Sequence, residues 1–313
     1  MFLPDVRVES EIPLDRTIPA VSDRVTVHPL TDNHKAEVLS FLSARPLHTV
    51  FLAGFIRDNG LVSLLNRGAF YGARNREGRL EGVALIGHAT LIEARTDAAL
   101  EAFAALARAC PSAHMILGEK ERVSDFWGYY AKAGETPRLV CRELLMEMRR
   151  PVKNLKVKNL KEVPGLRAAT IDDLACVMKV NAEMAFRESG VNPMEKDPAG
   201  FCTRSARRIE QGRVWLWAER GRLIFKAEVM SDTPEVIYLE GVYVDPQDRG
   251  TDHGLRCFSQ LSNTLMARGV SVCLFVNEKN RKARAFYRKA GYDLRSHYDT
   301  IFLRQKRVSK RIW

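Results

Sequence analysis

Two glutamates in the second half of the chain lie in otherwise apolar stretches and could take part in proton transfer. Glu240 belongs to the run VIYLEGVYV, and Glu228 belongs to the preceding run RLIFKAEV, where it shares a strand face with Lys226. A partly buried glutamate with a raised pKa is suited to act as a general base. The alternative for both is an exposed or ion-paired sheet residue, and Lys226 with Glu228 could be a purely structural pair. Because side chains alternate along a strand, we expect Glu240 to share its face with three apolar neighbours: Tyr238, Val242 and Val244.

A turn that could hold phosphate groups follows the strand of Glu240. The stretch RGTDHG, residues 249–254, opens an amphipathic helix. Free amides at a helix N-terminus, together with the helix dipole, form a site for a pyrophosphate. Asp252 complicates this reading, because a carboxylate at a helix start can cap the amides and repel phosphates. Arg249 and Arg256 could offset its charge.

These residues belong to the second of two halves that show the same order of elements. In the second half, a hairpin turning at Arg220-Gly221 is followed by the strand 236–244, a helix, the strand 272–276 and a helix that ends at Gly291. In the first half, strands at 69–73, 79–86 and 90–94 precede a helix, the strand 114–117 and the run GEKERVSDFWGYYAKAG. That run is similar to NEKNRKARAFYRKAG at 277–291, and it places Tyr130 and Gly134 at the positions of Tyr287 and Gly291. The pattern indicates an internal duplication, although any mixed sheet produces such a series of elements.

Size and composition are typical of two ordinary globular domains. The chain has 313 residues, of which 46% are hydrophobic and 28% charged, and no apolar run approaches the roughly 18 residues of a membrane span. The acid- and proline-containing start MFLPDVRVESEIPLDR is unlike a secretory signal. The six cysteines show no metal-ligand spacing, which argues against structural zinc and favours a reduced, cytoplasmic setting.

The net charge of +11 is concentrated in two segments. Six basic residues fall between Arg149 and Lys161 and five fall from Arg304 onward, with no acid in either segment, so the rest of the chain is close to neutral. Charge in a connector and a tail is typical of a solubilising surface rather than of a recognition element. We therefore expect neither nucleic acid nor a membrane as a partner.

The order strand, phosphate-sized turn, helix, strand, and helix ending in a tyrosine resembles the GNAT superfamily of acetyl-coenzyme A dependent N-acyltransferases. The resemblance covers residues 165–304. Arg249 and Gly254 match the first and last positions of the family's turn motif, while Asp252 replaces its middle glycine. Phe286-Tyr287 and Gly291 match a second motif, in which Tyr292 replaces a phenylalanine. The strings FKAEV and LEGVYVDPQDRG also resemble a bacterial subgroup that carries an extra N-terminal domain of uncharacterised function.

The resemblance implies an α/β fold with two GNAT-like domains in tandem, each a mixed, mostly antiparallel sheet flanked by helices. The expected divisions are a degenerate copy at 1–150, a basic linker at 151–164, the acetyltransferase domain at 165–304 and a basic tail at 305–313. In the first copy, the turn at 94–98 has no glycine, and Thr96 or Asp97 there is an ordinary helix cap. We therefore expect that only the second copy binds coenzyme A.

The implied activity is transfer of an acetyl group from acetyl-CoA to a primary amine by direct attack in a ternary complex. This reaction needs neither a metal nor a covalent enzyme intermediate. By resemblance Tyr287 is the general acid for the departing thiolate, and Glu240 or Glu228 is the general base. The family pattern assigns the following residues to contact with coenzyme A: Val242, Tyr243, Val244, Arg249, Gly250, Thr251, Asp252, His253, Gly254, Asn280 and Ala283.

The main alternative is a catalytically inactive tandem protein that acts as a binding or scaffold protein. Its best support in the sequence is Asp252. The acceptor could be a small-molecule amine or a peptide amine, since acceptor choice depends on loops that one sequence does not place. The oligomeric state is not readable from these patterns.

Overall fold

The computed structural model describes residues 25–150 and 162–304. Most of the expected basic linker at 151–164, and all of the expected tail at 305–313, lie outside the described residues. All six cysteines are free. No helix in the described ranges is long and apolar enough to cross a membrane.

The first half contains six strands and four α-helices among its described residues. In chain order these are β1 (Val25–Pro29), α1 (Lys35–Leu42), α2 (Pro46–Asn59), β2 (Gly68–Asn75), β3 (Leu80–Gly87), β4 (Ala89–Ala94), α3 (Asp97–Ala109), β5 (Met115–Glu119), α4 (Lys120–Tyr130) and β6 (Leu139–Met148). The strands and helices predicted from the sequence are present. Helix α2 begins with Pro46 at its first helical position and is followed by Gly60, which are the residue types common at these two helix positions.

The second half repeats this series. Its elements are β7 (Arg167–Ala168), α5 (Leu174–Ser189), α6 (Pro193–Lys196), α7 (Pro198–Glu210), β8 (Val214–Glu219), β9 (Arg222–Asp232), β10 (Val236–Val244), α8 (His253–Met266), β11 (Ser271–Asn277), α9 (Arg281–Lys289) and β12 (Asp293–Phe302). The predicted hairpin turn is present, with Arg220 at φ 51° and Gly221 at φ 76°. Gly134 and Gly291 both adopt positive φ after their helices, at 80° and 94°, which supports their equivalence in the two halves.

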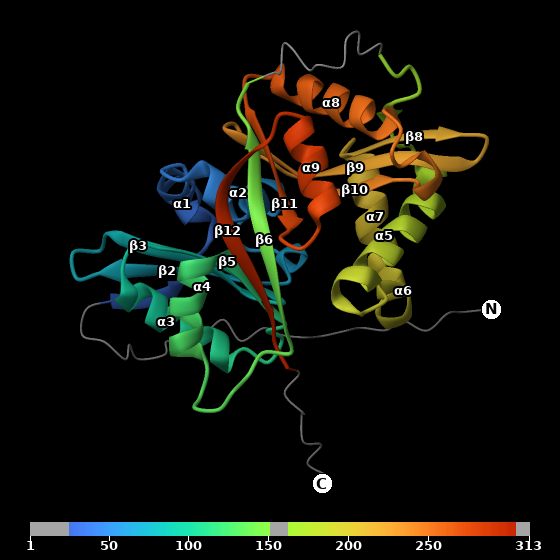
Figure 1. Cartoon of the computed structure of the whole chain (residues 1–313). Helices are drawn as coiled ribbons and strands as arrows, with labels where there is room; N and C mark the ends of the chain where they lie inside the picture. The colour runs from blue at the N-terminus through green and yellow to red at the C-terminus, as the bar shows by residue number, and fades with distance from the viewer. Residues whose placement is uncertain (1–24, 151–161, 305–313) are drawn as a thin grey trace, which may run out of the picture.

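A single sheet of twelve strands joins the halves. Its order is β1-β2-β3-β4-β5-β12-β6-β11-β10-β9-β8-β7. The last strand of each half pairs with a strand of the other half: β6 pairs with β11, and β12 pairs with β5 (Figure 1). The predicted mixed, mostly antiparallel sheet is confirmed. The two copies nevertheless do not have separate sheets, since β6 and β12 cross between them and pair with each other.

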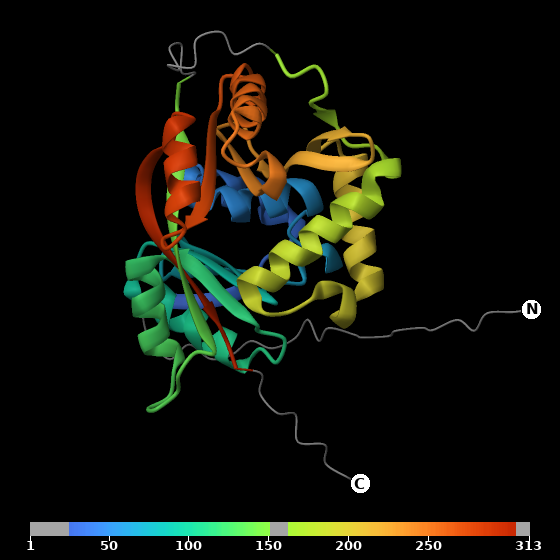
Figure 2. The ribbon, with the colours of Figure 1, turned by 45° about the vertical axis from the view of Figure 1, so that its right-hand side comes forward.

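Helices cover both faces of the sheet in the second half. Helices α8 and α9 pack on one face, in a core that includes Phe258, Leu261 and Tyr287. The other face is covered by α5 and α7, and also by α2 of the first half, which is seen in blue behind the centre of the molecule in Figure 2. Helix α2 comes so close that a Cβ added to Gly54 would lie 2.4 Å from the Oγ of Ser231 on β9. The first half therefore forms part of the environment of the second half's sheet.

Candidate active site

Strands β10 and β11 separate halfway along their length. They are parallel neighbours from Val236 opposite Ser271 to Leu239 opposite Leu274, and the pairing ends there. Strand β11 continues to pair with β6 as far as Asn277. The backbone of β10 beyond Leu239 therefore faces an opening on its β11 side, and its unpaired polar groups could bind an extended ligand as an added strand does.

A β-bulge sets the direction of the side chains at this opening. Glu240 pairs with Glu228 and Tyr243 pairs with Lys226, so Gly241 and Val242 together oppose one residue of β9. Gly241 has φ 61°, and a Cβ at this position would lie 2.9 Å from the Nζ of Lys226. The positive φ favours glycine here.

The bulge corrects one prediction from the sequence. Glu240 and Tyr238 lie on the face that α2 and α5 cover, but Val242 and Val244 pack against the α8 and α9 core on the opposite face. Simple alternation fails because the bulge adds one residue between Glu240 and Val242. Tyr243 instead contacts the cluster beneath α5 and α7.

The turn before α8 presents amides without acceptors. In the described ranges no acceptor is found for the amides of Gly250, Thr251, Asp252, Gly254 and Leu255. The amide of His253 donates to the Oγ1 of Thr251 at 3.3 Å, and that hydroxyl donates to the carbonyl of Asp248 at 2.6 Å. These free amides and the helix dipole form an anion site that suits a diphosphate.

Two residues of the motif hold this turn against the end of β10. A Cβ added to Gly254 would lie 2.6 Å from the Cγ2 of Val244, so glycine lets α8 approach the strand. Arg249 donates from its Nε to the carbonyl oxygen of Val244 at 2.9 Å. Arg249 and Gly254 therefore position the helix start beside the opening between β10 and β11.

Asp252 does not cap α8. It occupies the N-cap position, but its side chain accepts no hydrogen bond from the helix amides. Its carboxylate is exposed and lies 3.7 Å from the Nζ of Lys289 on α9. The amides are thus left free, and a neighbouring cation partly balances the carboxylate.

Helix α9 follows β11 and places Tyr287 in the core against which Val242 and Val244 pack. Tyr287 is buried against Phe258, and burial raises its pKa, which keeps the phenol protonated. Ala283 and Tyr287 both pack on the α8 and α9 core, as their spacing predicts. Asn280 caps α9, since its Oδ1 accepts from the amide of Ala283 at 3.1 Å. Its side-chain oxygen is therefore engaged in the helix start.

Glu240 lies within a group of three glutamates on the α5 side of the sheet. This acidic cluster consists of Glu143 on β6, Glu188 near the end of α5, and Glu240 on β10. Glu240 and Glu188 are exposed to water although protein surrounds them, and Glu143 is half-buried. The surrounding protein desolvates each carboxylate and so raises its pKa. Nearby carboxylates add to this rise, against the charge of Arg208 at Glu240 and the hydrogen bond from Thr300 at Glu143. Glu240 is therefore reachable from solvent and prone to hold a proton.

Glu228 has a different environment. It is buried, its carboxylate lies 2.8 Å from both the Nζ of Lys226 and the Nη1 of Arg208, and Asn181 donates to it at 2.6 Å. Burial opposes ionisation, but the two cations prevail and lower its pKa to about 2. A carboxylate held this firmly in its charged form is a poor base, and the pair with Lys226 fits the structural alternative.

The corresponding opening in the first half is reduced to a cavity of about 30 Å³. Strands β4 and β5 also separate, after Leu91 opposite Leu117. The guanidinium of Arg45 lies between them, 3.1 Å from Glu93 on β4 and 2.5 Å from Glu119 on β5. At the start of α3, the amide of Ala99 donates to the Oγ1 of Thr96 at 3.3 Å. Both contacts support the expectation that this half does not bind coenzyme A.

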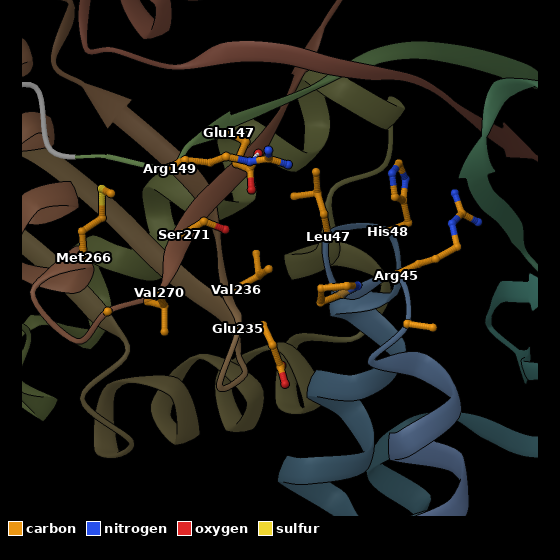
Figure 3. A pocket seen from close by; sticks show the side chains of 13 residues that line it. Arg45, Leu47, His48, Glu147, Arg149, Glu235, Val236, Met266, Val270 and Ser271 are labelled. Carbon is orange, nitrogen blue, oxygen red and sulfur yellow. Dashed lines mark hydrogen bonds and ion pairs between the residues drawn. The ribbon is translucent and has the colours of Figure 1, made fainter.

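A cavity of about 700 Å³ lies at the other end of β10 and β11. It is bounded by the starts of both strands, at Val236 and Ser271. Arg45, which precedes α2, and His48, which lies on α2, bound it on the other side (Figure 3). Glu147 and Arg149 form an ion pair on its wall. The strands open beyond Leu239 and Leu274, so this cavity is separate from the candidate active site.

Comparisons with known proteins concern the fold. Residues 228–301 match the family model described as FR47-like protein. No curated protein sequence matches the chain. The structure is similar to an acetyltransferase of the GNAT family from Colwellia psychrerythraea, with 12% identity, 90% of this chain and 99% of that chain covered, and a TM-score of 0.56.

Two further structures are similar over most of the chain. One is a tandem GNAT protein from the clavulanic acid biosynthesis pathway, with 15% identity, coverage of 89% of this chain and 98% of that chain, and a TM-score of 0.57. The other is a GCN5-related N-acetyltransferase from Sphaerobacter thermophilus, with 12% identity, coverage of 89% and 95%, and a TM-score of 0.52.

The chain therefore has the GNAT fold, and the resemblance predicted from its sequence is confirmed. More specifically, it is a tandem GNAT-fold protein, since the neighbours cover both halves and one of them is itself a tandem protein. The extra N-terminal domain of the bacterial subgroup stays a prediction.

Proposed function

We propose that this protein is an acyl-coenzyme A dependent N-acyltransferase that transfers acetyl from acetyl-CoA to a primary amine. The observation that carries the proposal is the free-amide turn at 250–255 directly beside the opening between β10 and β11. The turn offers a site for the diphosphate. The β10 backbone at Val242 to Val244 has no strand partner on its β11 side and offers a site for the extended pantetheine arm, although Arg249 already engages the carbonyl of Val244.

The residues around the opening can serve a direct transfer. The amine nitrogen attacks the thioester carbonyl, a C–N bond forms, and the C–S bond breaks as the tetrahedral intermediate collapses. Glu240 accepts the proton that the amine loses, directly or through water. Tyr287 gives its proton to the departing thiolate, for which a buried, protonated phenol is suited. We assign the base to Glu240 and not to Glu228, because the cations around Glu228 lower its pKa.

The proposal predicts that Gly254→Val weakens acetyl-CoA binding. A side chain here collides with Val244 and moves the helix start, so we expect the Kd from titration calorimetry to rise at least about tenfold, which is about 1.4 kcal/mol. Gly128→Val is the matched control, because Gly128 also lies in a helix and a Cβ there meets no atom within 4 Å. Equal affinities in the two variants, or no binding by the wild type, would contradict the proposal.

A second prediction concerns the acid. Tyr287→Phe is expected to lower kcat by about 10²-fold while the Kd for acetyl-CoA stays within about twofold, since only the proton donor is lost. Tyr292→Phe serves as the control: this phenol is equally buried but is bonded to Ser262 at 2.8 Å, so its loss should affect stability and not turnover. A Tyr287→Phe enzyme with wild-type kcat would remove Tyr287 as the acid.

The inactive-scaffold alternative has less support from this geometry than from the sequence. Its main argument was that Asp252 blocks the anion site, whereas the side chain points to Lys289 and leaves the amides free. A cytoplasmic location and the absence of a nucleic-acid or membrane partner stay predictions. The two basic segments on which a nucleic-acid role would depend lie largely outside the described residues.

A further inference from the structure

Two histidines of the first half stack against each other near the second half. The rings of His88 and His114 have centroids 4.8 Å apart and an angle of 12° between their planes. The backbone fixes this arrangement. The amide of His114 donates to the carbonyl oxygen of His88 at 3.1 Å, and the amide of His88 donates to the carbonyl oxygen of Arg67 at 2.9 Å. Phe302 of β12 meets His114 edge-on, at 5.8 Å.

Four cations from both halves surround the stacked rings. This basic cluster consists of Arg67 and Arg138 from the first half, and Lys196 and Arg204 from α6 and α7. Arg138 lies over the ring of Phe302 at 5.2 Å and donates to the carbonyl of Ser189 at the end of α5. Burial, together with these cations, lowers the pKa of His88 to about 4. Burial is also the main cause of the lowered pKa of His114, and Lys196, Arg138 and Arg67 lower it further.

The basic cluster has more positive charge than its neighbours balance. Asp197 pairs with Arg204 at 3.0 Å. Within the described ranges, neither Arg67 nor Lys196 has a carboxylate at ion-pair distance. Burial and the charge of Arg204 lower the pKa of the Arg67 guanidinium, although Asp197 opposes them. Asp197 balances only part of this charge, so an anionic ligand would lower the remaining repulsion between the cations.

The same sheet face connects this cluster to the candidate active site. Thr300 donates to the carboxylate of Glu143 at 2.7 Å, and Phe302 lies two residues further along β12 on the same face. Opposite Phe302 on β6 is Leu139, four residues from Glu143, which corresponds to about 13 Å along a strand. The last turn of α5 lies between the two regions, because Glu188 is near Glu143 and the carbonyl of Ser189 accepts from Arg138.

We propose that the basic cluster is an acceptor subsite that binds an oxyanion, a carboxylate or a phosphate, at the far end of the amine substrate. The inference rests on the proposed function for its catalytic end. An acceptor bound in this way carries its reactive amine near Glu240 and its anionic group toward the Leu139 end of β6, and Leu139 and Glu143 are separated by about four extended residues. The first half, which lacks an open cofactor site, then contributes to substrate selection.

The subsite can be tested without catalysis. The imidazole pKa values of His88 and His114 are measured by NMR in chloride and in inorganic phosphate at equal ionic strength. A bound phosphate offsets the cations, so both pKa values should rise in the wild type and in the exposed-lysine control Lys132→Gln. In Arg67→Gln/Lys196→Gln the response to phosphate should be lost. Identical titration curves in chloride and phosphate for the wild type would overturn the subsite.

The link to the acceptor is tested with tetraglycine and tetraglycine amide, which differ only in the terminal charge. The wild type is expected to acetylate the acid with at least tenfold higher kcat/KM, mainly through a lower KM, and Arg67→Gln/Lys196→Gln should lose this preference. Equal use of both peptides would leave the proposed function standing and refute the acceptor subsite. If neither is acetylated and acetyl-CoA does not bind, the proposed function fails, while the phosphate titration still decides the anion site.

Discussion

Glu240→Gln is expected to reduce kcat by about 10²- to 10³-fold, with the Kd for acetyl-CoA nearly unchanged. Glutamine keeps the size and polarity of the side chain but cannot accept the amine proton. Glu240 meets the demands on a base because it is reachable from water and lies next to the opening between β10 and β11. Glu235→Gln is the matched control, since Glu235 is exposed, precedes the same strand and has no side-chain partner in the described ranges.

The pH dependence gives an independent check on this assignment. Burial raises the pKa of Glu240, and Glu188 and Glu228 add to the effect against the opposing charge of Arg208. The base must be ionised to act, so kcat should rise with pH through a midpoint above the ordinary value of a glutamate and level off beyond it. This limb should be absent from the residual activity of Glu240→Gln. A variant that keeps both the wild-type kcat and the limb would assign the base elsewhere.

The pattern of residue types was enough to predict the elements around the site. Turn residues at Arg220-Gly221 and the apolar stripe of α8 are local signals, and the structure confirms both. The spacing of Ala283 and Tyr287 also predicted correctly that both side chains face the same core. Such signals are readable because each depends on neighbours within a few residues along the chain.

The features that the sequence did not predict depend on distant contacts. The bulge at Gly241 is a feature of the register between β10 and β9, so alternation alone put Val242 and Val244 on the wrong face. The exchange of β6 and β12 brings Glu143 beside Glu240, about a hundred residues away in the chain. No spacing rule links such positions. The same holds for Arg45, whose partners lie on β4 and β5.

The largest expected effect on stability is that of Lys226→Met, which should lower the free energy of unfolding by about 3 kcal/mol. Lys226 is fully buried, and its ammonium is one of the two cations that hold the buried carboxylate of Glu228. Methionine fills a similar volume but leaves Glu228 with Arg208, which is one-third exposed. The quantity to measure is the urea midpoint at constant slope. Lys289→Met, at an exposed ion pair, should change stability by less than about 0.5 kcal/mol.

Acid titration shows whether the buried charge is the cause. The folded pKa of Glu228 is about 2 against 4.5 for an ordinary glutamate, so its ionic contacts add stability above pH 4.5 that is lost as the pH falls toward 2. The shift corresponds to about 3 kcal/mol. The difference in unfolding free energy between the wild type and Lys226→Met should therefore shrink over this interval. Protonation removes the buried charge of Glu228, which in the variant has lost one of its two cations. Adding Glu228→Gln to Lys226→Met should recover part of the loss at neutral pH. A deficit that is independent of pH and unaffected by Glu228→Gln would mean that Lys226 stabilises the sheet by packing and not by its charge.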